Sequence, residues 1–196
     1  ETYTWGAVNG NGVYRSTDGG NTWRLIFGGF NNTPSNQLSY IQDIIAWVNP
    51  TSGLTEIYFG ADAMAYTEEV TSGSGGAGFT FLGSNTIGVW KSTDGVNFVR
   101  QTNASLQSSA GVYCAPETFV KTANGDLYMG TKHSYATGAG GGRIYRCTDG
   151  VNWTLVRTLA SANGRVRLVA SQQTNGRMTA LCENFANGLP VIRRST

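Results

Sequence analysis

The chain has 196 residues, of which only 13% are charged, and its formal net charge is +2. Soluble domains average about 25% charged residues, so this chain is poor in charge. It contains 27 glycines and many Thr, Asn and Ser residues, which favours turns and short strands over long helices. Its 8 Phe, 9 Tyr and 5 Trp residues are enough to build a core and argue against disorder.

Several classes of protein are excluded by this composition. No apolar run reaches about 18 residues, so the sequence predicts no transmembrane helix and no membrane insertion. The 14 Lys and Arg residues are scattered, and without a basic stripe we expect no nucleic-acid partner. The three cysteines have the spacing of neither a disulfide framework nor a metal site, so we expect buried thiols, no metal and no cofactor.

Alternating apolar residues bounded by turn residues predict strands along the whole chain. In chain order they are Tyr3–Val8 and a hairpin ending at Phe27; Asp43–Val48, Glu56–Gly60 and a hairpin from Val89; Glu117–Thr122, Asp126–Thr131 and a hairpin from Ile144; and Arg167–Ser171, Arg177–Glu183 and Leu189–Ser195. The strands therefore fall into four groups, of which the first three end on a similar hairpin.

The hairpins share a repeated motif, in which Ser or Cys and Thr-Asp-Gly are followed by an aromatic residue. Its copies are Ser16–Trp23, Ser92–Phe98 and Cys147–Trp153, and the segment 192–196 matches the start of a fourth. The Asp is expected to accept hydrogen bonds from turn amides, the Gly to supply a positive φ, and the aromatic residue to cover the hairpin. The structural residues are therefore Asp18, Trp23, Asp94, Phe98, Asp149 and Trp153.

The motif resembles the Asp-box, Ser-x-Asp-x-Gly-x-Thr-Trp, also called the bacterial neuraminidase repeat. The first copy matches every specified position, whereas the second and third copies shorten the turn by one residue. This resemblance implies an all-β fold, a sialidase-like β-propeller of four-stranded antiparallel blades. The chain then holds about three and a half to four blades, near 1–30, 38–103, 111–160 and 164–196, in a single propeller domain or a propeller fragment.

The irregular segments all fall in the connections that such a propeller gathers on the face opposite the Asp-boxes. They are 28–38, 61–85, 101–116 and 132–142. Long loops on a rigid scaffold commonly carry binding sites, although the Gly-rich tracts are equally consistent with flexible spacers. The ligand-binding candidates on this face are Tyr66, Tyr113, His133, Tyr135, Arg167 and Glu183.

Three carboxylates are candidates for catalysis on the same face, namely Asp43, Asp62 and Glu117. Paired carboxylates there would suit glycoside hydrolysis, while the alternative is that they cap strands or bind loop amides. The sialidase resemblance implies an Arg-Ile-Pro motif and three separate arginines, but the motif is absent and Arg165, Arg167 and Arg177 fall in one predicted blade. No catalytic set therefore transfers. A single histidine also suits neither a metal site nor a serine-type triad.

The leading hypothesis is a non-enzymatic module that binds a glycan or another cell-surface ligand, in a protein located outside the cell or on a virion, such as an adhesion or tail-fibre protein. One alternative is a glycoside hydrolase that uses the carboxylates, and another is a structural component of a larger particle. Three and a half blades would leave sheet edges exposed, which proteins avoid. We therefore expect that the chain ends pair, that copies associate, or that the chain belongs to a longer propeller.

Overall fold

The computed structural model describes residues 10–29, 33–38, 40–66, 80–109, 111–159, 164–173, 176–183 and 191–194. The predicted strand 3–8 and the predicted pairing of the two chain ends lie outside these residues. Within them the fold is all-β, and its only helical segments are the single-turn 3-10 helices η1 (Pro34–Asn36) and η2 (Ala104–Leu106). No helix among the described residues is long and apolar enough to cross a membrane.

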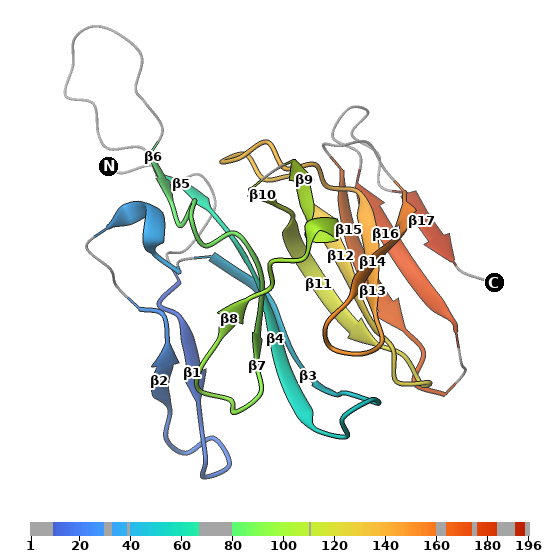
Figure 1. Ribbon diagram of the computed structural model, residues 1–196, viewed down its shortest axis with the longest axis horizontal. Coiled ribbons are helices and arrows are strands. Elements are labelled where there is room, and N and C mark those ends of the chain that lie inside the picture. Colours follow the sequence, from blue (N-terminus) through green and yellow to red (C-terminus); the bar gives the residue numbers. More distant parts are fainter. Residues whose placement is uncertain are drawn as a thin grey trace, which may run out of the picture.

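Four antiparallel sheets follow one another along the chain (Figure 1). The first sheet pairs β1 (Val13–Arg15) with β2 (Arg24–Phe27). The second contains β3 (Tyr40–Val48), β4 (Thr55–Asp62), β7 (Gly88–Ser92) and β8 (Val99–Arg100). The third contains β11 (Ala115–Lys121), β12 (Leu127–Lys132), β13 (Arg143–Cys147) and β14 (Trp153–Thr158). The fourth contains β15 (Arg165–Ala170), β16 (Met178–Glu183) and β17 (Val191–Arg194). The predicted four-stranded antiparallel sheets are thus confirmed for the second and third groups.

The sheets stand side by side, and the first strands of the second, third and fourth sheets are in contact. Strand β3 packs against β11, and β11 packs against β15. The first sheet and β17 lie at opposite ends of this row (Figure 1). Two small hairpins complete the structure, β5 (Met64–Tyr66) with β6 (Thr80–Leu82) and β9 (Gln107–Ser109) with β10 (Val112–Tyr113).

An apolar cluster fills each space between neighbouring sheets. Phe27, Phe59 and Phe98 lie between the first and second sheets, and Tyr58 and Trp153 pack edge to face between the second and third. Burial of such aromatic surface is the main stabilising contribution in a sheet protein of this kind. Close approach also depends on glycine, because a Cβ on Gly60 would lie 2.5 Å from the Cβ of Pro116. Gly130, at the same position of the third sheet, would meet the carbonyl oxygen of Val166.

The three repeated turns have the hydrogen bonds that the sequence predicts. The Asp94 carboxylate accepts the N–H groups of Val96 and Asn97 at 2.8 and 2.7 Å. The Asp149 carboxylate accepts those of Val151 and Asn152 at the same distances. In the longer first copy, Asp18 accepts both the N–H and the hydroxyl of Thr22. These hydrogen bonds lower the pKa of Asp18 and of Asp149 to about 2. The turn glycines, at 19, 95 and 150, all have φ between 72 and 75°.

The aromatic residue after the turn behaves differently in the first copy. Phe98 and Trp153 are buried, because each packs against the preceding sheet. Trp23 is 63% exposed and only closes its own turn, where its indole N–H donates to the carbonyl of Gly20. The physical reason is that no described sheet precedes the first one, so the ring has no partner surface.

A buried polar network ties the third turn to the second sheet. Asn49 donates to the carbonyl of Asp149 at 2.9 Å and to Glu56 at 3.0 Å, and Lys91 pairs with Glu56 at 2.9 Å. The Tyr58 hydroxyl donates to Glu56 at 2.6 Å. Burial first, and then Glu56, raises the pKa of this tyrosine well above its ordinary value, so it stays a neutral donor.

Candidate functional site

Strand register places several charged residues at one end of the sheets. In the second, third and fourth sheets, the first residue of the first strand pairs with the last residue of the second strand. These pairs are Tyr40 with Asp62, Ala115 with Lys132, and Arg165 with Glu183. We call this end, defined by these six residues, the loop end. It lies uppermost in Figure 1, and the repeated turns lie at the opposite end.

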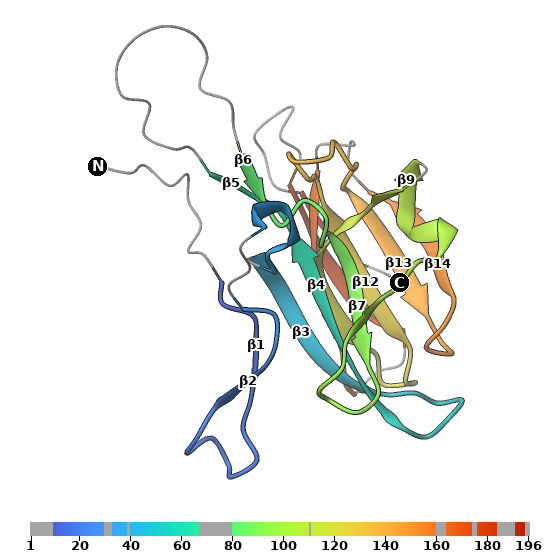
Figure 2. The same ribbon diagram turned by 60° about the vertical axis from the view of Figure 1, so that its left-hand side comes forward.

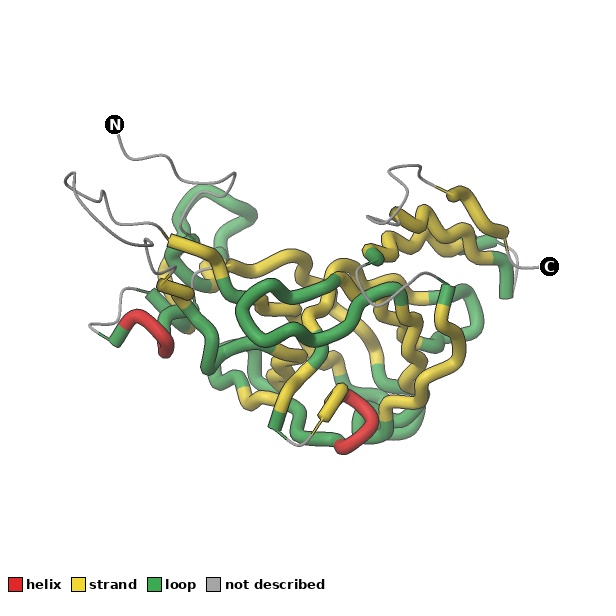
Figure 3. Tube along the Cα trace, turned by 90° about the horizontal axis from the view of Figure 1, so that it is seen from above, coloured by secondary structure: helices red, strands yellow, loops and turns green. Residues whose placement is uncertain are grey.

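All four predicted irregular segments connect strands at the loop end. They contain η1, the β5–β6 hairpin, η2 with the β9–β10 hairpin, and the segment 133–142. Figure 2 shows the β5–β6 hairpin projecting beyond β3 and β4, and Figure 3 looks down on this end, with loops green and the two 3-10 helices red. The side chain of the binding candidate Tyr66, in β5, lies outside the described part of the structure.

Glu117 forms the centre of an ionic cluster between the third and fourth sheets. Its side chain is fully buried at an irregularity in the register of β11. Its Oε1 accepts the Nε and Nη2 of Arg165 at 2.7 and 2.6 Å and the Nε of Arg167 at 2.8 Å. Glu183 lies 3.6 Å from Arg165 at the rim. Burial lowers the pKa of Arg165, but the hydrogen bond and charge of Glu117 outweigh it and the pKa is raised.

Asp62 forms the centre of a second cluster, between the second and third sheets. Its buried carboxylate pairs with Lys132 at 2.8 Å and accepts the hydroxyl of Ser134 at 2.8 Å. The Lys132 ammonium also lies 4.7 Å from the centre of the Tyr40 ring, within reach of a cation–π interaction. Sequence reasoning missed Tyr40 and the part played by Lys132. Their position in the predicted strands could have indicated them, because Tyr40 pairs with Asp62 and Lys132 ends its strand as Asp62 and Glu183 end theirs.

Asp43 is occupied by main-chain contacts. One carboxylate oxygen accepts the N–H of Phe119 at 2.7 Å, and the other accepts the N–H of Ile44 at 2.8 Å. It therefore links β3 to β11. The structure thus places all three catalytic candidates, Asp43, Asp62 and Glu117, in contacts that hold neighbouring sheets together.

His133 and Tyr135 form an aromatic pair at the loop end, in which Tyr135 is exposed and His133 is half-buried. Their rings meet edge to face with centroids 5.0 Å apart, and Tyr135 is 72% exposed. Between them Ser134 is buried on Asp62, and its backbone N–H and carbonyl bond Ala139 and Gly138 at 3.0 and 2.9 Å. The exposed tyrosine is therefore held on an anchored turn.

The remaining candidates lie as follows. Tyr113, on β10, is half-buried, with the Arg100 guanidinium 4.3 Å from the centre of its ring. Arg167 keeps 59% of its side chain exposed beside Glu117, so it has surface left for a ligand. Arg177 belongs to the same sheet as Arg165 and Arg167, but it follows the turn between β15 and β16, at the opposite end from Arg165.

The described residues hold no group of three or more His, Cys, Asp and Glu residues placed to bind a metal ion. The cysteines 114, 147 and 182 are buried as free thiols. Burial raises the pKa of Cys114 to about 12 and that of Cys147 to about 11, which makes both thiols poor nucleophiles. Comparison of the chain with protein-family models, with curated proteins and with solved structures finds no match.

Proposed function

We propose that this chain is a recognition module that binds a glycan or another cell-surface ligand through the loop end. The observation that carries the proposal is the exposed Tyr135, which follows the anchored Ser134 and whose ring meets that of His133 edge to face. An exposed aromatic ring that is already held in place offers a flat apolar face at little entropic cost, and sugar rings bind such faces. Arg167 and Glu183 add charged groups at the same end.

The fold on which this proposal rests is an Asp-box propeller of the sialidase-like group, or a piece of one. Three repeated turns with the same carboxylate bonds, the consecutive pairing of strands in each sheet and the contacts among β3, β11 and β15 all support it. Location outside the cell or on a virion surface belongs to the same proposal, as does association with further sheets from another copy or a longer chain.

Glycoside hydrolysis receives less support than binding. A hydrolase of this kind needs two carboxyl groups that face the bond being broken. Asp43, Asp62 and Glu117 are instead occupied by backbone amides, Lys132 and two arginines. A polysaccharide hydrolysis assay on Asp62→Asn checks this alternative, and we expect no activity in either the variant or the parent chain.

A glycan array tests the proposal against the alternative of a purely structural component. We expect the chain to bind a subset of glycans and Tyr135→Ala to lose at least tenfold in affinity, as expected for the loss of an aromatic ring from a binding site. Tyr14→Ala is the matched control, because Tyr14 is also an exposed tyrosine, 43% exposed, but lies on the first sheet. An array without binding, or equal losses in both variants, would refute the proposal.

A further inference from the structure

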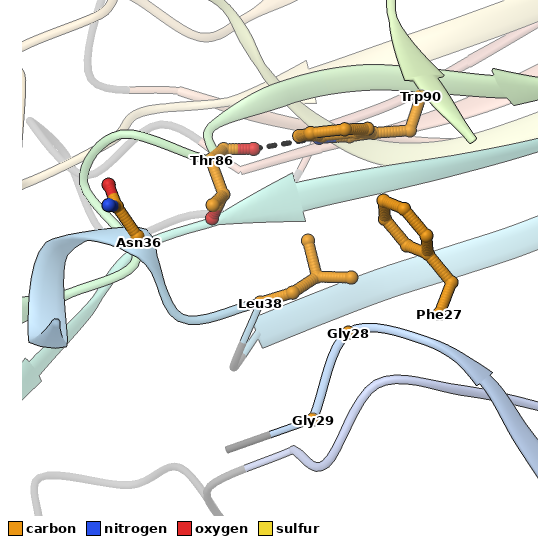
Figure 4. A pocket seen from close by; sticks show the side chains of 7 residues that line it. All are labelled: Phe27, Gly28, Gly29, Asn36, Leu38, Thr86 and Trp90. Atoms are coloured by element: carbon orange, nitrogen blue, oxygen red, sulfur yellow. Dashed lines mark hydrogen bonds between the residues drawn. The ribbon is translucent and has the colours of Figure 1, made fainter. Parts of the chain in front are cut away.

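A separate cavity lies between the first and second sheets. It has a volume of about 260 Å³, and Phe27, Gly28, Gly29, Asn36, Leu38, Thr86 and Trp90 line it. Figure 4 shows the indole of Trp90 edge-on, with Leu38 and Phe27 across the space from it and Asn36 and Thr86 at one end. None of these residues takes part in the two ionic clusters at the loop end.

The wall of the cavity is rigid on its aromatic side. The indole N–H of Trp90 donates to the carbonyl of Thr86 at 2.8 Å, which fixes the orientation of the ring. Phe59 lies parallel to it, with an interplanar angle of 9°, and Phe27 packs 5.4 Å away at a tilt. Opposite, the wall is the bare backbone of two glycines, Gly28 and Gly29, whose φ values are 83 and 98°.

Polar groups are confined to one end of the cavity. Asn36 is exposed at this end, and its Oδ1 accepts the side-chain amide of Asn85 at 2.8 Å. This bond orients the Asn36 amide, whose own NH₂ group donates to none of the described residues. Thr86 is less available, because the single proton of its hydroxyl is shared between the carbonyls of Gln37 and Gly83, at 3.0 and 2.9 Å.

We propose that this cavity is a second carbohydrate site, which takes one uncharged pyranose ring. None of the residues that line it is charged, so nothing in the cavity compensates a carboxylate, sulfate or amine. An apolar lining with a few polar groups at one end is the usual form of a small-molecule site. A pyranose suits it because the C–H face of the sugar can lie against Trp90 while a hydroxyl accepts the Asn36 amide.

This inference rests on the proposed function, since it assumes that the chain binds carbohydrate, but it concerns different residues. The two sites also differ in chemistry. The loop end offers Arg167 and Glu183 to a charged ligand, whereas the cavity offers only an indole face and an amide.

The test is a titration of the ¹⁵N-labelled chain with methyl glucoside, methyl galactoside and methyl N-acetylglucosaminide, followed by NMR. The indole N–H signal of Trp90 is assigned by its absence from Trp90→Phe. We expect that signal and the side-chain amide of Asn36 to shift saturably, in the millimolar range, with at least one glycoside. Tyr135→Ala should titrate identically, because it leaves the cavity intact.

Asn36→Leu is the decisive variant, because it removes the amide at an exposed position of the cavity. We expect its affinity to fall at least tenfold while the other indole signals keep their positions, which reports a folded chain. Unshifted Trp90 with all three glycosides, or unchanged binding in Asn36→Leu, overturns the second site. A titration with the free compound indole is added as a further control. If indole binds and none of the glycosides does, the second site is overturned, since the cavity would then be simply apolar. Failure of Tyr135→Ala on the glycan array bears only on the loop end.

Discussion

Replacing Glu117 with Gln tests whether the buried carboxylate holds the third and fourth sheets together. The change keeps the shape of the side chain and removes its charge, leaving Arg165 and Arg167 beside an amide that cannot neutralise them. The Glu117 side chain is fully buried, whereas those of Arg165 and Arg167 are 32% and 59% exposed. Breaking a buried ion pair costs about 3–5 kcal/mol, and water around the arginines favours the lower end, about 3 kcal/mol.

Thermal unfolding followed by circular dichroism measures this loss. For a chain of this length, about 3 kcal/mol corresponds to a decrease in Tm of roughly 6–12 °C. Glu183→Gln is the control, because Glu183 lies 3.6 Å from Arg165 with 41% of its side chain exposed, and its loss should cost less than about 1 kcal/mol. Equal Tm values for the two variants would refute the reasoning, since the carboxylate would then be no more important than a surface charge.

Three further predictions concern the sheet contacts, the repeated turns and the thiols. Gly60→Ala should lower the urea midpoint of unfolding by an amount equivalent to about 1–3 kcal/mol, because the new methyl group meets the rigid ring of Pro116; an unchanged midpoint would contradict the packing described. Asp149→Asn should destabilise the chain at neutral pH, since the folded carboxylate has a pKa lowered from 3.8 to about 2. The parent chain loses this contribution as the pH falls from 3.8 to about 2. The difference in unfolding free energy between the two chains should therefore shrink over that range in acid unfolding curves. A difference that grew on acidification would contradict the prediction. The thiols of Cys114 and Cys147 should stay unreactive towards Ellman's reagent at pH 8 and react once guanidinium unfolds the chain, whereas rapid native labelling would contradict their burial.

Strands and turns were predictable because their signals are local. Asn124 and Gly125, for example, lie in the turn between β11 and β12, where Gly125 has a φ of 89°. An Asn-Gly pair between two strands indicates such a turn from the sequence alone. The same holds for the repeated turns, where Asp94 and Asp149 bind amides only two and three residues away. Strand ends were less accurate, since β3 begins at Tyr40 rather than Asp43. An added strand residue depends on its cross-strand partner, here Asp62, and not on its own neighbours.

The candidate site was predictable in its location but not in its contacts. The sequence placed His133, Tyr135, Arg167 and Glu183 at one end, because strand and turn lengths decide which end of a sheet each residue reaches. It did not indicate that Glu117 would accept hydrogen bonds from arginines 48 and 50 residues away.

By itself, then, the sequence determined the all-β class, the order of the strands and the geometry of the repeated turns, since each depends on residues close together in the chain. Only the tertiary structure decided which of those residues are buried and which can meet a ligand. Trp23 and Trp153 occupy the same place in the motif, yet one is 63% and the other 2% exposed. The difference arises because a preceding sheet covers Trp153 and none of the described sheets covers Trp23. Packing between sheets brings together residues that lie far apart in the sequence, so no local sequence pattern indicates it.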